Sequence, residues 1–170
     1  MGLFTGQVAL EYLWRNSRDV TAMNQISRRS ILLATASAFV APSVFAQPKS
    51  VKLYKDPNCP CCEGHAAYLN NNGFAVEIIP TIDLLAKYAE AGVPSQLHGC
   101  HIIEMDGYVV IGHVPVEPIL KMLAERPKII GISIPGMPVG LPGMEGPRSG
   151  PIAVYEIVPG AGRTRVFVNV

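Results

Sequence analysis

The sequence predicts one α/β domain, and three observations support this fold class. The 170 residues are 49% hydrophobic and 16% charged, a composition typical of a chain that folds around one core. Over residues 51–125, short β-branched and aromatic runs alternate with segments of helical spacing. Turn-forming residues separate these segments. Together these patterns indicate a central sheet with helices packed on its faces.

The first elements form a predicted β-α-β unit. Residues 51–54 are β-branched and aromatic, which favours a strand, and Asp56-Pro57-Asn58 turns the chain. Residues 62–71 are compatible with a helix, and Gly73 follows at the position of a C-terminal cap. The inner face of this helix carries His65, Ala66 and Leu69. Residues 74–79 then predict a second strand.

The next elements complete a mixed sheet. Helical spacing over residues 83–91 predicts a second helix. Residues 100–105 and 108–111 flank Asp106-Gly107, which is a strong two-residue hairpin signal. Residues 118–125 supply a third helix. The order β-α-β-α-β-β-α, with cysteines at the first strand-to-helix turn, is typical of a thioredoxin-like (glutaredoxin-like) fold.

The C-terminal part predicts a loop and a hairpin. Residues 131–151 hold six Gly and five Pro, too many for a regular element, so we expect a loop that wraps the domain. Residues 152–158 and 164–168 should form a final hairpin around a Gly-rich turn at residues 160–162.

Residues 1–46 are predicted to be an export leader. Arg28 and Arg29 precede an apolar run over residues 31–40, and Val44-Phe45-Ala46 is a small-residue site for cleavage after Ala46. The arginine pair resembles the twin-arginine type of signal peptide. We therefore expect the mature protein in the periplasm.

Two further expectations concern the ends of this leader. Met23 opens a compact signal, so translation could begin there. The apolar run has about ten residues, whereas a membrane-spanning helix needs about 20, so no stable membrane anchor is expected after cleavage. Residues 47–170 should then form a single domain.

The charge of residues 47–170 argues against two classes of partner. These residues carry ten Lys or Arg and eleven Asp or Glu, a formal charge of −1. Nucleic acids and anionic membrane surfaces both favour clustered Lys and Arg. We therefore expect neither as a partner, and small ligands or proteins remain.

The residues that can carry chemistry are concentrated in residues 59–113. This stretch contains all the histidines and all the cysteines. The cysteines are Cys59, Cys61, Cys62 and Cys100. Thiols in the periplasm are oxidised to disulfides unless something protects or occupies them. Four cysteines in such a protein therefore need an explanation.

The cysteines allow three interpretations. A C-P-x-C at the start of a helix is a redox signature, in which Cys59 would be the nucleophile and Cys62 would resolve the mixed disulfide. Cys61 is not needed for that chemistry, and three thiols in four residues favour a soft metal, Cu(I) or zinc. A structural disulfide from Cys59 or Cys62 to Cys100 is the third interpretation.

The position of Cys100 favours the metal interpretation. In thioredoxin-like folds the start of the third strand lies beside the first strand-to-helix turn, and His98-Gly99-Cys100-His101 occupies that start. A fourth thiol would then face the other three. Redox families of this fold place a cis-proline there, whereas here the nearest proline, Pro94, lies six residues before Cys100.

Three histidines are further candidate ligands. His65 follows Cys61 by four residues and shares its helical face, although packing against the sheet is an equal alternative. His101 follows Cys100 directly, and strand alternation would send the two side chains to opposite faces unless the strand entry is irregular. His113 begins the loop after the fourth predicted strand. For His101 the alternative is a satisfied surface or core histidine.

Two methionines complete the candidate set. Met137 and Met144 lie in two Pro-Gly-Met steps, seven residues apart, in the predicted loop. Thioethers are soft ligands that suit Cu(I). The alternative is that these methionines fill gaps beneath the loop.

Several spaced segments resemble a known family. They are YKDPNCPCC, LNNNGF, GVPSQLHGCH, the GY and GHVP pair, RP and PGMPVGLPGMEG. The chain resembles the CopG-like periplasmic copper-resistance-associated metal-binding proteins. The resemblance implies a thioredoxin-like fold, export, and copper bound near Cys59, Cys61, Cys62 and Cys100. That family usually has tryptophan where this chain has His65, a departure that could add a ligand.

The function expected from the sequence is therefore copper binding. We expect a periplasmic protein that serves copper tolerance or trafficking through a Cys-rich Cu(I) site and could also cycle between oxidation states. Copper ions and other periplasmic copper-handling proteins are the expected partners. One alternative is a thiol-disulfide oxidoreductase that uses Cys59 and Cys62. Another is an interaction module stabilised by zinc in a closed tetrahedral site.

Overall fold

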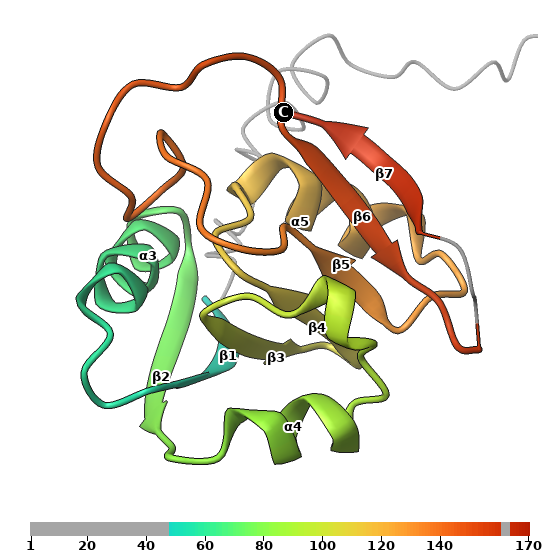
Figure 1. The fold of residues 1–170 in the computed structure, drawn as a ribbon, viewed down its shortest axis with the longest axis horizontal. Helices are drawn as coiled ribbons and strands as arrows, with labels where there is room; N and C mark the ends of the chain where they lie inside the picture. The colour runs from blue at the N-terminus through green and yellow to red at the C-terminus, as the bar shows by residue number, and fades with distance from the viewer. Residues whose placement is uncertain (1–47, 161–163) are drawn as a thin grey trace, which may run out of the picture. The chain divides into compact units, whose positions relative to one another are not determined.

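A computed structural model describes residues 48–160 and 164–170 (Figure 1). The predicted leader at residues 1–46, including the start at Met23, lies outside the described residues, as does most of the predicted turn at residues 160–162. Within the described ranges the chain is mixed α/β, with a seven-stranded sheet and three α-helices.

The elements follow the predicted order. They are β1 Lys49–Lys55, α3 Pro60–Asn71, β2 Phe74–Pro80, α4 Leu84–Glu90, the 3₁₀ helix η2 Ser95–Leu97, β3 His101–Met105, β4 Tyr108–Ile111, α5 Val116–Glu125, β5 Gly131–Ser133, β6 Ala153–Ile157 and β7 Arg165–Asn169. The seven elements predicted between residues 51 and 125 and the final hairpin strands are confirmed.

The sheet has the strand order β2-β1-β3-β4-β5-β6-β7. Strands β1 and β2 are parallel, as are β4 and β5, and the other neighbours are antiparallel. Asp106 and Gly107 join β3 to β4 and both have positive φ, 49° and 83°, as a type I′ turn requires. This two-residue turn sets the hairpin register, which pairs Ile102 with Ile111.

The prediction that residues 131–151 contain no regular element is wrong at its start. Residues Gly131–Ser133 form β5, which pairs with β4 on one side and β6 on the other. A Cβ at Gly131 would overlap the carbonyl of Val109 on β4. Glycine is therefore needed here for close strand pairing and does not mark a loop.

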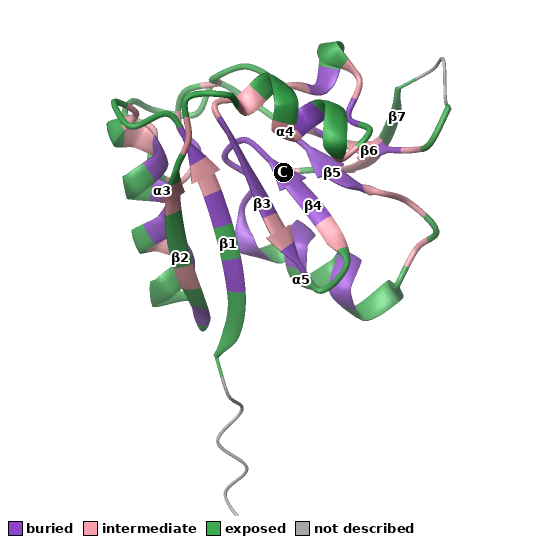
Figure 2. Ribbon diagram, turned by 90° about the horizontal axis from the view of Figure 1, so that it is seen from below, coloured by how far each residue is buried: buried purple, intermediate pink, exposed green. Residues whose placement is uncertain are grey.

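The two faces of the sheet carry separate hydrophobic cores. Ile103 and Met105 on β3 pack beneath α3 and α5, while Ile102 packs with Tyr88 of α4 on the other face. Figure 1 shows α5 above and α4 below the central strands. Strands β3 and β4 are buried along nearly their whole length (Figure 2). The ends of these central strands therefore form a rigid base for side chains nearby.

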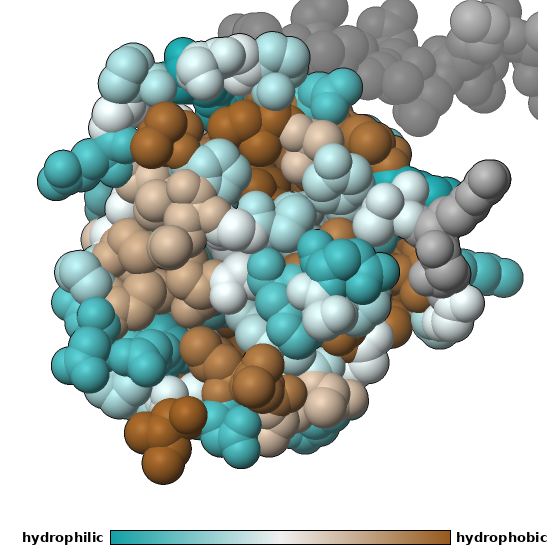
Figure 3. Space-filling model, in the orientation of Figure 1, coloured by the Kyte–Doolittle hydropathy of each residue, from teal (hydrophilic) through white to brown (hydrophobic). Residues whose placement is uncertain are grey.

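The surface of the described residues is mixed. Apolar and polar residues intermingle on the face drawn in Figure 3. Exposed apolar side chains include Ile82 and Leu85 near α4 and Met137 in the loop after β5. Among the described residues, each helix is too short or too polar to cross a bilayer.

Candidate metal centre

Three cysteines lie at the N-terminus of α3. Cys59 is the N-cap residue with an extended backbone, and Pro60 occupies the first helical position, where its missing N–H costs no hydrogen bond. Cys59 and Cys62 form a disulfide with Cα atoms 5.5 Å apart. Cys61 is a free thiol whose Sγ lies 3.4 Å from Sγ of Cys59.

The fourth cysteine joins this cluster through the sheet. Cys100 directly precedes β3, and β3 pairs with β1 so that His101 lies opposite Lys55, close to the β1–α3 turn. The Sγ atoms of Cys59, Cys61, Cys62 and Cys100 all lie within 4.8 Å of one another. The structure therefore brings together all four cysteines that the sequence analysis selected.

Two histidines extend the thiol cluster. Cys100 Sγ lies 3.0 Å from Nε2 of His113 and 3.7 Å from Nδ1 of His101. The ligand atoms of these three residues also lie within 4.8 Å of one another. His101 is the first residue of β3, whereas Cys100 lies outside the strand, so the expectation that alternation separates the two side chains does not apply.

The orientation of His113 follows from its hydrogen bonds. Its Nδ1 lies 2.7 Å from the carbonyl oxygen of Pro142. A carbonyl can only accept, so Nδ1 carries the proton and donates it. In the neutral ring, Nε2 then presents its lone pair to Cys100, whose thiol can donate to it.

His65 lies next to this pair. It faces inward from α3, as predicted, and its ring is fully buried. Its Nδ1 lies 2.8 Å from Nε2 of His101, and its Nε2 lies 3.0 Å from the carbonyl oxygen of Val114. A continuous chain of polar contacts therefore runs from Cys100 through His101 and His65 to Val114.

Burial keeps the three rings uncharged. It lowers the pKa of His65 to about 4, although the Val114 carbonyl opposes this shift. Burial also holds the pKa of His101 well below its usual value, reinforced by the neighbouring His65 and His113. The pKa of His113 is lowered by burial and partly restored by the Pro142 carbonyl. Neutral imidazoles keep the lone pairs that bind metals.

Cys100 is protonated in this environment. Burial, followed by the neighbouring Cys61 thiol, raises the pKa of the Cys100 thiol to about 12. A soft cation bound here would have to displace that proton, since thiolate is the form that coordinates metal.

A strap covers the centre; we use this name for residues 135–146, between β5 and β6. Gly143 has φ 78°, and a Cβ there would lie 2.5 Å from the backbone nitrogen of His65 and 2.6 Å from the carbonyl oxygen of Cys61. A Cβ on Gly64 would lie 3.0 Å from Cα of Gly143. The strap therefore packs directly against the first turns of α3.

The two methionines of the strap differ in their surroundings. Met144 packs partly against the core beneath α3 and α5, whereas Met137 is 63% exposed. The contacts of the strap with the centre come from the Pro142 carbonyl and the Gly143 backbone.

Lys55 is a site residue to which sequence reasoning gave no role. Its side chain is 2% exposed, and its ammonium donates to the carbonyls of Asp56 and Pro57 and to Glu63 Oε1. These three acceptors use all three of its donors and hold the turn before Cys59 against α3. The sequence does indicate its burial. Lys55 alternates with Val51 and Leu53, and all three side chains lie on the buried face of β1.

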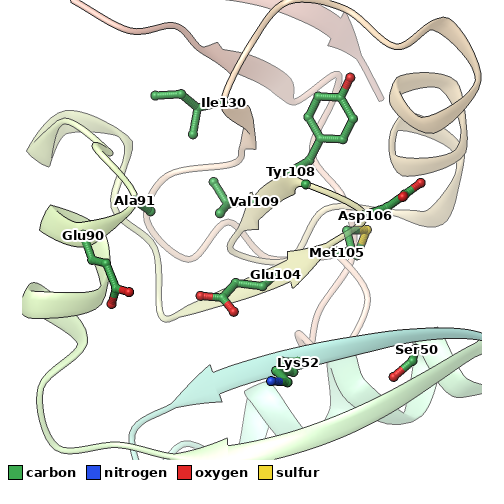
Figure 4. A pocket seen from close by; sticks show the side chains of 11 residues that line it. Ser50, Lys52, Glu90, Ala91, Glu104, Met105, Asp106, Tyr108, Val109 and Ile130 are labelled. Atoms are coloured by element: carbon green, nitrogen blue, oxygen red, sulfur yellow. The ribbon is translucent and has the colours of Figure 1, made fainter.

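An open pocket of about 650 Å³ lies away from the cysteines. Figure 4 shows it between α4 and the turn from β3 to β4, with Lys52, Glu90 and Glu104 around it. None of its lining residues belongs to the thiol cluster or to the histidine pair.

Comparisons with known proteins match one family model and two solved structures. The family described as "Protein of unknown function, DUF411" matches residues 97–144, which include Cys100, His101, His113 and most of the strap. Two solved structures, of copper resistance protein copG in forms 2 and 1, match with a TM-score of 0.66 each. The two structures are 38% and 37% identical to this chain. Each match covers 72% of this chain and 98% of the copG chain. No significant match was found among curated proteins.

Proposed function

The chain belongs to the CopG-like copper-resistance family, and on that premise we propose that it binds copper as Cu(I) and serves copper tolerance or trafficking outside the cytoplasm. The observation that carries the proposal is the cluster of four cysteine sulfurs within 4.8 Å of one another. Thiolates are soft ligands that favour Cu(I) over hard cations.

The donor set suits copper in composition and protonation. Cys59, Cys61, Cys62 and Cys100 form one group of neighbouring ligand atoms, and Cys100, His101 and His113 form a second, so Cys100 links the sulfur donors to the imidazole donors. Imidazole and thiolate together accept copper or zinc, and neither favours magnesium or calcium. Copper would then be the cargo that these six side chains hold, with Met137 and Met144 as outer candidates in the strap.

The disulfide divides the donors into two groups. With Cys59 and Cys62 joined, the free donors are Cys61, Cys100 and the two imidazoles. A two-electron, two-proton reduction of the S–S bond by a dithiol would release two more thiols. We infer that the reduced protein is the form with full capacity for Cu(I).

The thioredoxin-like assignment is part of the same proposal. Its support is the strand order β2-β1-β3-β4, with cysteines at the first strand-to-helix turn and helices on both faces. Strands β5, β6 and β7 would then extend that fold at the β4 side.

The location of the protein is also proposed. The family relationship and the twin-arginine-type pattern at Arg28 and Arg29 support export to the periplasm and cleavage after Ala46. The mature chain would be residues 47–170, a single metal-binding domain. Its partners would be copper ions and other periplasmic copper-handling proteins.

One observation favours a second function. The Cys59–Cys62 disulfide joins the two residues of the C-P-x-C pattern, with the free Cys61 thiol beside it. A thiol-disulfide oxidoreductase would use this pair and would not need Cys61 or Cys100.

Competition against a strong Cu(I) chelator separates these functions. The reduced wild-type chain should retain Cu(I), and Cys61→Ser and Cys100→Ser should each weaken retention, while zinc competes poorly. The matched control is His98→Ala, because that histidine contacts Val93 and lies outside both ligand clusters. Loss of Cu(I) to the chelator, combined with turnover of a model disulfide that survives Cys61→Ser, would favour the oxidoreductase. Tighter retention of zinc than of copper would favour the zinc-stabilised module.

A further inference from the structure

The two imidazoles beside Cys100 are held by different partners. His113 is held by a backbone carbonyl, whereas Nε2 of His101 faces Nδ1 of His65 at 2.8 Å. Two imidazole nitrogens form a hydrogen bond only when one donates and the other accepts. The direction of this bond therefore decides which nitrogen of His101 carries a proton.

The Val114 carbonyl determines that direction. It lies 3.0 Å from Nε2 of His65 and can only accept, so His65 Nε2 carries a proton. A neutral His65 then has its lone pair on Nδ1, and His101 Nε2–H must donate to it. The remaining nitrogen of His101, Nδ1, keeps a lone pair on the side of Cys100.

Burial supports the neutral state that this reasoning requires. His65 and His101 are both fully buried, and a charged imidazolium without a partner charge is costly in such a site. No carboxylate is among their hydrogen-bond partners in the described residues, so these contacts offer no charge that would stabilise an imidazolium.

We propose that His65 is a positioning residue of the copper centre. By accepting a hydrogen bond from His101 Nε2–H, it leaves the lone pair of His101 Nδ1 free to bind the metal beside Cys100. The inference rests on the proposed copper function and adds to it the residue that selects a nitrogen ligand. A group that fixes the tautomer and orientation of a ligating histidine commonly changes metal affinity without touching the metal.

An apolar residue at position 65 would remove this control. His101 would lose its acceptor at Nε2, while Cys100 Sγ lies 3.7 Å from Nδ1 and the Gly112 backbone also contacts the ring. A proton moved to Nδ1 would then remove the lone pair that could bind the metal. It would also donate a hydrogen bond to the Cys100 sulfur. The substitution His65→Gln would retain an acceptor for His101 and a donor for Val114.

The first test reads the tautomer directly in the metal-free full-length chain. Nitrogen-15 NMR of the histidine rings should show His101 protonated at Nε2 and unprotonated at Nδ1 in the wild type. In His65→Leu the proton should move to Nδ1 or the ring should exchange between tautomers, while His65→Gln should resemble the wild type. A wild-type His101 protonated at Nδ1 would overturn the proposal, even if the Leu variant does not fold.

The second test measures Cu(I) affinity by chelator competition and the nitrogen-to-sulfur ligand ratio by X-ray absorption. His65→Leu should lower affinity by about 10–100-fold and lower the nitrogen count, and His65→Gln should restore most of both. Equal losses in the Leu and Gln variants, with His101 unchanged in tautomer, would mean that His65 acts only through packing. Since the tautomer is read without copper, failure of copper binding altogether would reject the proposed function and leave the NMR result standing.

Discussion

Cys100 and His113 face each other across the end of the β3–β4 hairpin, with Cys100 Sγ 3.0 Å from His113 Nε2. The hairpin register ends at the pair Ile102–Ile111, and the segments just beyond this pair carry Cys100 and His113. The contact therefore depends on the two-residue turn at Asp106-Gly107 at the far end of the hairpin. Local turn chemistry thus controls which side chains meet at the metal centre.

Removal of the His113 imidazole should weaken copper binding. In His113→Ala we expect Cu(I) affinity to fall by about 10–100-fold, the range typical when groups around a metal are removed. Chelator competition measures the change, and His98→Ala should leave affinity unchanged because the His98 ring contacts the Val93 carbonyl, stacks on Tyr88 and lies outside both ligand groups. Equal effects of the two variants would place His113 outside the centre.

Reduction should increase the copper capacity of the protein. The disulfide form offers Cys61 and Cys100 as free thiols, whereas the reduced form offers four. We expect the reduced chain to retain more Cu(I) per protein in competition with a chelator than the disulfide form does. Cys59→Ser should lose this redox dependence. Identical retention before and after reduction would mean that the disulfide sulfurs take no part in binding.

The contact between the strap and α3 should be sensitive to a single methyl group. In Gly143→Ala the new Cβ would overlap the backbone of Cys61 and His65, and we expect a loss of stability. Gly136→Ala is a matched control because Gly136 has a similar φ, 72° against 78°, and open space around its Cβ position. Both variants carry a strain of about 1–3 kcal/mol from positive φ. Chemical denaturation should show a larger loss for Gly143→Ala.

Lys55 should contribute to stability through its three hydrogen bonds. In Lys55→Met the buried volume is kept, but the carbonyls of Asp56 and Pro57 lose their donor, which should cost about 1–3 kcal/mol of the free energy of unfolding. Lys87→Met is the control, since the Lys87–Glu90 pair is at the surface and such pairs contribute about 0–1 kcal/mol. If the two substitutions lower the free energy of unfolding by the same amount, the buried lysine does not stabilise the turn before Cys59.

Acid should destabilise the protein through its buried histidines. The pKa of His65 falls from 6.5 to about 4 on folding, so between these values the unfolded chain binds the proton more readily. Stability is then highest above about pH 6.5 and falls as the pH drops toward 4, by up to about 3 kcal/mol for this group. Urea unfolding at a series of pH values measures the slope. His65→Gln should show a shallower slope, and an unchanged slope would contradict this assignment.

The order of elements was predictable because each segment carries its own local signal. Hydrophobic periodicity marked the strands and helices, and Asp106-Gly107 marked the hairpin. The meeting of Cys100 with the first three cysteines was predictable from topology alone. Strand β5 was not predicted because a glycine in a Gly- and Pro-rich segment indicates a loop. Gly131 is instead required by the close approach of the Val109 carbonyl, which the sequence does not show.

The histidine chain could not be derived in the same way. Sequence spacing placed His65 on the inner face of its helix, but the contact with His101 depends on how α3 packs across β3. Strand alternation would separate His101 from Cys100 only at a regular strand entry, and β3 begins at His101, after Cys100. Side-chain hydrogen bonds between distant segments carry no periodic signature.

The extension of the sheet by β5 has a consequence for self-association. Without it, β4 would be an edge strand with unpaired backbone groups. Pairing with β5 moves the exposed edge out to β7, and the adjoining β6 carries a register shift between Val154 and Tyr155. Irregular or charged edges resist the addition of a further strand, and β7 begins with an exposed arginine, Arg165. On this side of the sheet the open strand edge therefore lies three strands beyond β4, while β2 forms the edge on the other side.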